Sequence, residues 1–270
     1  MPNGAAPLDR LRADLESLGS VVVAFSGGVD SAFLAHVAHE TLGSDRARAV
    51  TAVSPSLAAV EWEEAASLAD EWGLRWTTID TDEMASAAYR ANDPDRCFHC
   101  KDALMDAVGP IAEADGATVL LGVTLDDLGD HRPGQRAAAE RGARFPLLDA
   151  GFTKAEVREQ SRLMGLRTWD KPAGPCLASR VPYGTPVSVT VLSTVERAEA
   201  GLRRLGFNEL RVRHYGDTAR IEVPDCRLAD VVAQRTEVVA VVSAAGYRYV
   251  TLDLAGLRSG NLNDGLRSEA

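Results

Sequence analysis

A run of five apolar residues, Val21–Phe25, leads directly into the short, glycine-containing segment Ser26–Ser31. The run has the length of a buried strand, and the apolar residues after Ser31 recur with the spacing of a helix. A buried strand that turns at once into a helix is typical of β-α-β units, whose strands pair in parallel. This feature therefore predicts an α/β fold.

Segments further along the chain continue the alternation of strands and helices. The expected strands are 49–53, 74–79 and 118–121, and the expected helices are 57–72, 101–114 and 153–164. Thr153 and Glu156 have the spacing of a capping box, which predicts the start of the last helix. Strands that alternate with helices of this length favour a parallel sheet with helices on both faces.

The segment 170–186 interrupts this pattern, because its prolines prevent any long regular element. Beyond it the sequence predicts a helix at 189–205, a hairpin of strands 210–215 and 219–223, a helix at 231–244 and a strand at 247–252. We therefore expect two domains: a parallel-sheet domain over 1–182 and a smaller α+β domain over 183–270.

The charge balance limits the partners of the chain. Lys and Arg number 29 and Asp and Glu number 39, so the formal net charge is −10, which disfavours nucleic acid and anionic membranes. No apolar stretch is long enough to span a membrane. The first ten residues lack the profile of a signal peptide, and four cysteines are too few for a secreted disulfide scaffold. We therefore expect a cytoplasmic protein with reduced thiols.

The glycine-containing segment has the composition of an anion-binding turn. Backbone N–H groups and the helix dipole attract phosphate to a helix start, and two glycines allow close approach. Asp30 would repel phosphate, but it can hold Mg²⁺ beside a nucleotide. The candidate nucleotide-binding residues are Ser26, Gly27, Gly28, Asp30 and Ser31. Neither GxxxxGK[ST] nor GxGxxG occurs here, and an ordinary Gly-Gly turn that caps a helix is the alternative interpretation.

Three of the cysteines are candidates for a common site. Cys97 and Cys100 form a CxxC pair, and Cys176 lies in the proline-rich segment. Three thiolates can hold a [4Fe–4S] cluster with one iron left open. A structural zinc ion would need a fourth ligand, but no second CxxC exists, His99 lies inside the pair, and His131 is distant in the sequence. The pattern is also compatible with a redox dithiol, or with three unconnected cysteines in the core.

Charged side chains outside the turn are candidates for binding substrate and metal. Lys101 and Arg180 flank the cysteines, where either can lower a thiol pKa or hold a carboxylate. Arg211 and Arg213 alternate along a strand, so both project from one face and can bind phosphate; cross-strand ion pairs are the alternative. The acidic pair Asp126–Asp127 follows a strand end, where Asp127 can ligate metal or simply face solvent.

Two motifs resemble known families. The SGGVDS string of Ser26–Ser31 after a first strand resembles the PP-loop of the ATP pyrophosphatase superfamily, whose members split ATP into AMP and pyrophosphate. The segment Pro175–Gly184, PCLASRVPYG, followed by Leu210–His214 and Gly216–Val223, resembles the LarE family. That family inserts sulfur during biosynthesis of the nickel-pincer nucleotide cofactor, and the resemblance extends over nearly the whole chain.

The LarE resemblance implies a PP-loop domain with a smaller C-terminal domain and an ATP-dependent sulfurtransferase activity. ATP would adenylate a carboxylate of pyridinium-3,5-biscarboxylic acid mononucleotide, and sulfur would then replace AMP. Cys176 matches the sulfur-donor position, with Asp30 and Arg180 as further catalytic candidates. In three-cysteine members Cys97, Cys100 and Cys176 would hold a [4Fe–4S] cluster beside the cofactors ATP and Mg²⁺. The resemblance also implies that the chain forms a homo-oligomer and that a nickel-insertion enzyme is its partner.

Two other functions remain open from the sequence. A PP-loop enzyme that thiolates tRNA would need a basic RNA-binding surface, which the net charge of −10 disfavours. A non-catalytic sensor of adenine nucleotides would not need Cys176 or the prolines and glycines around it.

Overall fold

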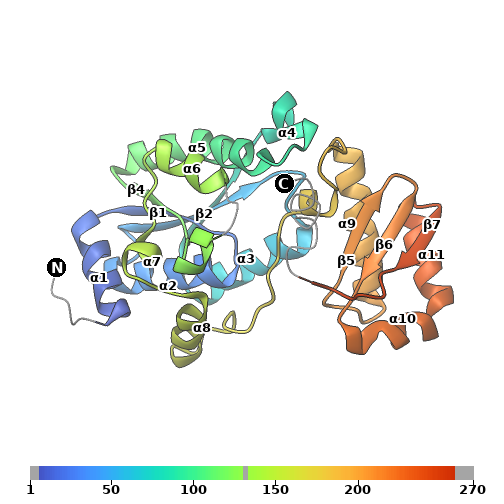
Figure 1. The fold of residues 1–270 in the computed structure, drawn as a ribbon. Coiled ribbons are helices and arrows are strands. Elements are labelled where there is room, and N and C mark those ends of the chain that lie inside the picture. The colour runs from blue at the N-terminus through green and yellow to red at the C-terminus, as the bar shows by residue number, and fades with distance from the viewer. Residues whose placement is uncertain (1–5, 130–132, 259–270) are drawn as a thin grey trace. The chain divides into compact units, whose positions relative to one another are not determined.

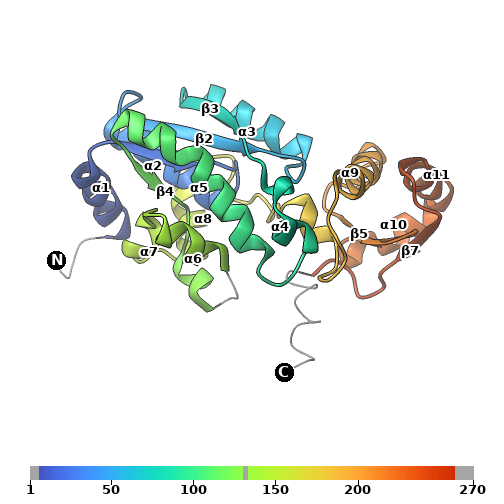
Figure 2. The same ribbon diagram turned by 90° about the horizontal axis from the view of Figure 1, so that it is seen from above.

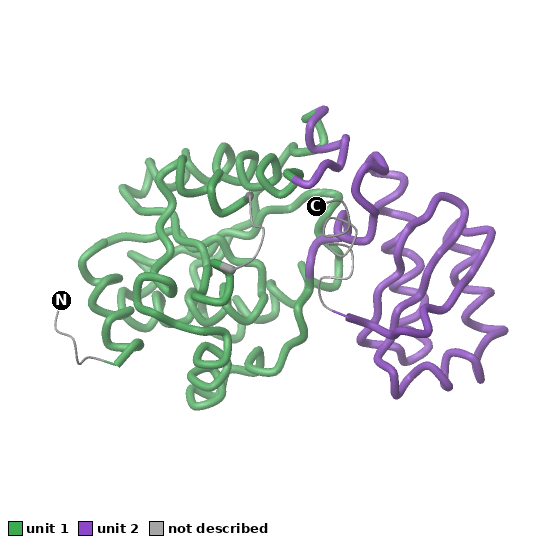
Figure 3. Tube along the Cα trace, in the orientation of Figure 1, with its two compact units in different colours: residues 1–86, 95–174 green, residues 87–94, 175–270 purple. Residues whose placement is uncertain are grey.

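A computed structural model describes residues 6–129 and 133–258. The chain forms two compact units, shown in different colours in Figure 3. Unit 1 comprises Met1–Ser86 and Asp95–Gly174, and unit 2 comprises Ala87–Pro94 and Pro175–Ala270. The sequence predicted a division at 182/183, whereas the compact units divide at 174/175 and exchange one short segment.

Asn92 explains why the segment 87–94 belongs to unit 2. Its buried side-chain amide donates hydrogen bonds to the carbonyl oxygens of Pro182 and Thr185, each at 2.8 Å. The carbonyl of Asn92 accepts a hydrogen bond from Gly184 N at 3.1 Å. Buried polar groups need such partners, and these lie about ninety positions away in the chain. No local pattern in the sequence indicates this pairing.

Unit 1 is built on four parallel strands in the order β3-β2-β1-β4 (Figure 1). The strands are β1 Val21–Ala24, β2 Ala47–Val53, β3 Arg75–Asp80 and β4 Thr118–Leu120. In the register, Val21 lies between Ala47 and Thr118. The predicted parallel-sheet α/β class is confirmed.

Alternate residues of β1 pack into two different cores. Val21 and Val23 pack in the core that contains residues of α1 Pro7–Leu18, α2 Val29–Leu42, α3 Ala59–Glu71 and α8 Lys154–Leu163. Val22 packs in the core formed with α5 Arg96–Asp115 and α6 Pro133–Glu140. Helices therefore cover both faces of the sheet, as predicted. In Figure 1, α5 and α6 lie on one side of the sheet and α2 and α8 on the other, and in Figure 2, seen from above, α5 lies in front of the sheet. Each buried valine contributes about 1.5–3 kcal/mol.

The remaining elements of unit 1 are shorter, and one helix begins earlier than expected. They are η1 Glu83–Ala85, η2 Leu125–Gly129 and α7 Pro146–Asp149. The capping box of Thr153 and Glu156 is confirmed at the start of α8. The predicted helix at 101–114 begins at Arg96 instead, so the CxxC pair lies on its first turn. This turn closes through a hydrogen bond from Phe98 N to Asp95 O at 2.7 Å.

Unit 2 is a small α+β unit. Strands β5 Arg211–Tyr215 and β6 Thr218–Glu222 form the predicted hairpin, and β7 Tyr249–Leu252 pairs with β6 in parallel. The helices are α4 Ala87–Ala91, α9 Val189–Arg204, α10 Leu228–Ala233 and α11 Arg235–Ala245, with η3 Leu177–Arg180 and η4 Asp225–Arg227. The single helix predicted at 231–244 is wrong, because Gln234 leaves the helical conformation with φ −98° and ψ 24°. Within the described part of the chain, no helix is both long and apolar enough to cross a membrane.

Candidate functional site

The turn Ser26–Ser31 joins β1 to the N-terminus of α2, as the sequence predicts. Gly27 has φ +68°, and Gly28 is the helix N-cap without any side-chain cap of its own. Ser31 Oγ accepts a hydrogen bond from Ser26 N at 3.2 Å and lies 3.0 Å from Ser26 Oγ. The two serines thus close the turn, while the N–H groups at the start of α2 suit an anion.

Two glycines allow other elements to approach this turn closely. A Cβ atom on Gly27 would lie 3.3 Å from Ala65 of α3. A Cβ atom on Gly122, directly after β4, would lie 2.9 Å from the peptide between Asp30 and Ser31. Gly122 is therefore required for the sheet edge to meet the start of α2. Sequence reasoning missed it, although a glycine directly after a predicted strand was the available signal.

Lys171 contacts the turn from a distant part of the chain. Its Nζ donates to the carbonyl oxygen of Gly27 at 3.1 Å and to Oε2 of Glu61 at 2.8 Å. Sequence reasoning did not place Lys171 at the site. Its rarity was the one signal, because the chain has 29 Lys and Arg residues of which only Lys101, Lys154 and Lys171 are lysines.

A chain of hydrogen bonds supports the end of β1 beneath the turn. Thr51 Oγ1 donates to the carbonyl oxygen of Phe25 at 2.7 Å and accepts from Trp76 Nε1 at 2.8 Å. Thr51 is buried, so each of these polar groups would otherwise lie without a partner. The bonds link β1, β2 and β3 at the edge that carries the turn.

Cys97 and Cys100 lie three residues apart on the first turn of α5 and so share a helix face. Cys97 is exposed and Cys100 is half-buried. A Cβ atom on Gly134 of α6 would lie 2.7 Å from Cys97 O and 2.8 Å from Lys101 Cγ. Close packing against α6 therefore holds Lys101 and the thiol pair in place. His131, the zinc-ligand alternative, lies outside the described residues.

Cys176 is exposed at the N-cap of η3 in unit 2. The Arg180 side chain is only 4% exposed, and its guanidinium donates to the carbonyl oxygens of Pro175 and Cys176, the latter at 3.1 Å. It also forms a two-point ion pair with Glu199 of α9, at 2.9 and 3.0 Å. Arg180 therefore holds the backbone at Cys176, and its catalytic role stays a prediction.

Glu199 is the buried anchor of this arrangement. Besides Arg180, its carboxylate accepts from Val212 N at 3.0 Å and from Arg203 at 3.0 Å. Burial acts to raise the pKa of Glu199, but the charge and hydrogen bonds of Arg180 outweigh it and hold that pKa below its usual value. The carboxylate is therefore charged at neutral pH.

Arg211 and Arg213 lie on one face of β5, as predicted, and the register places Arg220 and Glu222 of β6 on the same face. Arg213 forms an ion pair with Glu222 at 2.8 Å and donates to Ser179 O at 2.8 Å. Burial, together with the nearby charge of Arg180, lowers the pKa of Arg211 to about 10. The ion pair of Arg213 and Glu222 is a cross-strand pair of the kind that the alternative interpretation expects, and phosphate binding stays a prediction.

The acidic pair after β4 anchors the start of α8. Asp127 is buried, accepts from Thr124 N at 3.0 Å and pairs with Lys154 Nζ at 2.8 Å. Asp126 accepts from Lys154 N at 2.7 Å. Both carboxylates thus contact Lys154, and metal binding by Asp127 stays a prediction.

Within residues 6–129 and 133–258, no three His, Cys, Asp or Glu side chains come together as a metal site. Cys97 and Cys100 belong to unit 1, whereas Cys176 belongs to unit 2. Each unit by itself presents exposed thiol, and a CxxC pair on one helical turn can bind two irons of one cluster. The CxxC pair by itself therefore fits two ligand positions of an iron–sulfur cluster, and the cluster and the participation of Cys176 stay predictions.

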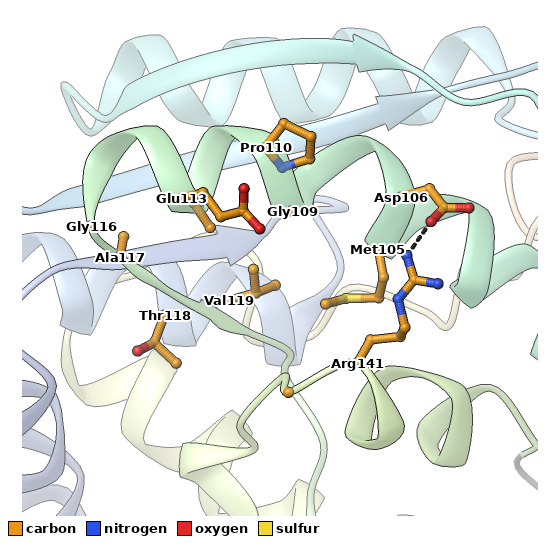
Figure 4. Close-up of a pocket in the computed structure, with 12 residues that line it drawn as sticks. Met105, Asp106, Gly109, Pro110, Glu113, Gly116, Ala117, Thr118, Val119 and Arg141 are labelled. Carbon is orange, nitrogen blue, oxygen red and sulfur yellow. Dashed lines mark hydrogen bonds and ion pairs between the residues drawn. The ribbon is translucent and has the colours of Figure 1, made fainter.

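A hollow of about 540 Å³ lies at the opposite end of unit 1 (Figure 4). Thr118 and Val119 at the start of β4 line it, and the turn Ser26–Ser31 follows the other end of the parallel strand β1. Arg141 lies across the hollow and pairs with Asp106 of α5. The hollow is therefore separate from the candidate nucleotide site.

Comparisons with known proteins match both units. The family described as NAD synthase matches residues 8–106. The chain is 46% identical to the uncharacterized protein slr1717 of Synechocystis, over 95% of this chain and 96% of that protein. It is 40% identical to the pyridinium-3,5-bisthiocarboxylic acid mononucleotide synthase of Lactiplantibacillus plantarum, over 95% of this chain and 93% of that protein. A segment of 68 residues is 44% identical to the NH(3)-dependent NAD(+) synthetase of Methanosarcina mazei.

Proposed function

The chain belongs to the LarE family of ATP-dependent sulfurtransferases, and we propose that it converts a carboxylate of pyridinium-3,5-biscarboxylic acid mononucleotide into a thiocarboxylate. The observation that carries this proposal is a pair of features in one chain. A glycine-lined anion turn opens α2, and an exposed Cys176 is held at its backbone by a buried arginine. The name of the Lactiplantibacillus relative supports the choice of substrate.

The nucleotide step belongs to the turn Ser26–Ser31. A carboxylate resists attack by a thiolate, because its leaving group would be oxide, whereas an acyl-adenylate releases AMP. The N–H groups of Gly28 and the next residues, with the hydroxyls of Ser26 and Ser31, would bind the departing pyrophosphate at the helix start. Asp30 would hold the Mg²⁺ that neutralises the phosphate charge.

The sulfur step belongs to Cys176. Its Sγ would attack the acyl carbon of the adenylate, forming a C–S bond while AMP leaves with the electron pair of the broken C–O bond. Removal of the Cα proton of Cys176 by a base would then break its Cβ–Sγ bond. The electron pair stays on the thiocarboxylate sulfur, and residue 176 becomes dehydroalanine without any external oxidant or reductant.

The three cysteines support a second version of the sulfur step. By resemblance to three-cysteine members, Cys97, Cys100 and Cys176 would be the ligands of a [4Fe–4S] cluster. When bound, such a cluster would supply an open iron on which an extra sulfide could be held for transfer, so that sulfur delivery would not consume Cys176. In this version Cys176 keeps its sulfur, and Lys101 and Arg180 hold the segments that carry the ligands.

The arginine face of β5 would bind the phosphate of the substrate. Arg211 and Arg213 stand beside Arg220, and Glu222 neutralises only part of their charge. Burial first, and then the charge of Arg180, lowers the pKa of Arg211, so an anion bound there would favour its charged form. Planar guanidinium groups suit phosphate by two-point hydrogen bonding.

We also propose two partners for this reaction. Copies of the chain would form a homo-oligomer, and a nickel-insertion enzyme would receive the product, because thiocarboxylate sulfur is a soft ligand for a transition metal. Sedimentation of the purified chain, alone and with product, measures its oligomeric state directly.

Metal analysis of protein purified without oxygen tests the two sulfur versions. About four irons per chain, lost in Cys97→Ser but kept in Cys226→Ser, would support the cluster, because Cys226 is an exposed cysteine outside the trio. Metal-free protein whose mass falls by one H₂S after reaction would support the sacrificial version. Zinc in place of iron, with no change of mass, would contradict both versions.

A further inference from the structure

Lys171 holds the turn Ser26–Ser31 through a backbone carbonyl. Its Nζ lies 3.1 Å from the carbonyl oxygen of Gly27 and 2.8 Å from the carboxylate of Glu61. The side chains of Lys171 and Glu61 are only 17% and 25% exposed. A charge-assisted hydrogen bond that is largely shielded from water is stronger than an exposed one.

This bond sets the direction of the neighbouring N–H group. The carbonyl of Gly27 and the N–H of Gly28 belong to one peptide, and in a trans peptide the two groups point in opposite directions. With the carbonyl held toward Lys171, the Gly28 N–H points away from it, toward Ser26 Oγ at 3.4 Å. That side of the peptide carries the two hydroxyls and the start of α2.

A peptide between two glycines needs such a constraint. Neither Gly27 nor Gly28 has a Cβ atom, so the backbone can rotate this peptide more easily than any other in the turn. Gly27 already lies in the left-handed region, with φ +68°. A reversed peptide would present its carbonyl oxygen to phosphate, and the partial negative charge of that oxygen would repel the phosphate.

Three elements of unit 1 build the support around Lys171. Glu61 and Ala65 lie four residues apart on α3, so the same helix face orients Lys171 and packs against Gly27. A Cβ atom on Gly174 would lie 2.7 Å from Glu61 Oε1, so the segment after Lys171 also closes over this carboxylate. Arg158 of α8 donates to the carbonyl oxygen of Lys171 at 2.9 Å.

We propose that Lys171, oriented by Glu61, is a positioning residue that keeps the Gly28 N–H on the side of the Ser26 and Ser31 hydroxyls, where it can turn from its long bond to Ser26 Oγ to the pyrophosphate of ATP. The inference rests on the proposed use of this turn to bind pyrophosphate. It assigns to Lys171 an action through Gly27, which differs from direct contact between an ammonium and phosphate.

The binding of pyrophosphate and of AMP to the full chain, measured by calorimetry, tests this role. Lys171→Met should weaken pyrophosphate binding at least tenfold and change AMP binding less than twofold, while Lys171→Arg should recover most of the loss. Glu61→Gln keeps the lysine and should lose three- to fivefold. Arg167→Met is the matched control, because Arg167 ties the same region to Glu71 and Ser67 of α3 without contacting the turn.

A glycine-labelled NMR spectrum separates positioning from direct contact. If Lys171 sets the peptide orientation, the Gly28 amide resonance should shift in Lys171→Met before any anion is added. An unchanged resonance, unchanged pyrophosphate affinity, or equal losses for pyrophosphate and AMP would overturn the inference. A wild-type chain that binds no pyrophosphate would overturn both the inference and the proposed role of the turn.

Discussion

The turn Ser26–Ser31 and the Cys176 segment are both held in place by other parts of their own unit, but by different kinds of contact. The turn Ser26–Ser31 uses backbone N–H groups, hydroxyls and close packing against glycines, with a single distant lysine. The Cys176 segment contains prolines and has little regular structure, so a buried arginine and a buried glutamate hold it. Backbone N–H donors are present whatever the side chains are, whereas a buried ion pair is lost when either partner is replaced.

The largest expected effect is on catalysis at the turn. Asp30→Asn should reduce pyrophosphate release more than a hundredfold, because the neutral amide binds Mg²⁺ poorly beside the nucleotide. The thermal unfolding temperature should change little, since residue 30 lies in the first turn of α2 and asparagine is tolerated there. Pyrophosphate release at the wild-type rate would remove Asp30 from the mechanism.

The next largest effect is expected when the ion pair of the Cys176 segment is broken. Glu199→Gln should destabilise the protein by about 3–5 kcal/mol, because it leaves the buried charge of Arg180 without its counterion. Urea unfolding measures the loss. Glu237→Gln, an exposed residue of α11, is the control and should change stability by less than about 0.5 kcal/mol. A loss of less than about 1 kcal/mol in Glu199→Gln would show that the Cys176 segment does not depend on this ion pair.

A smaller effect tests the close packing at the turn. Gly122→Ala should cost about 1–3 kcal/mol, because its Cβ would lie 2.9 Å from the backbone at Asp30 and Ser31. The same change should weaken ATP binding, since the start of α2 must move. Gly109→Ala is the control: nothing lies within 4 Å of a Cβ there, so we expect no loss in unfolding or binding measurements.

The smallest effect is a dependence of stability on pH. The pKa of Glu199 is held below its usual value of 4.5 in the folded chain, chiefly by Arg180 acting against burial. Its charged form therefore stabilises the fold at neutral pH, and this contribution is lost as the pH falls through the folded-state pKa. Unfolding curves between pH 7 and pH 3 should show less acid dependence in Glu199→Gln than in the wild type. Equal acid dependence would contradict the assignment.

Local pattern by itself determined much of this protein. The apolar run before Ser26, the capping box at Thr153 and the hairpin of β5 and β6 depend on contacts between near neighbours, and all three are present. The family resemblance came from two motifs, each contiguous in the chain. The predicted start of α5 was wrong by only a few residues, since the helix begins at Arg96 instead of Lys101.

Tertiary structure decided which distant residues support those motifs. Lys171 and Gly27 are 144 positions apart, and Asn92 and Pro182 are 90 apart. Gly122 matters only because the end of β4 meets the start of α2. The sequence predicted Arg180 beside the thiol of Cys176. In the structure its guanidinium instead forms hydrogen bonds with Glu199 and with the backbone carbonyl of Cys176. No periodicity encodes such pairs, because they form only when the fold brings separate elements together and buries their polar groups.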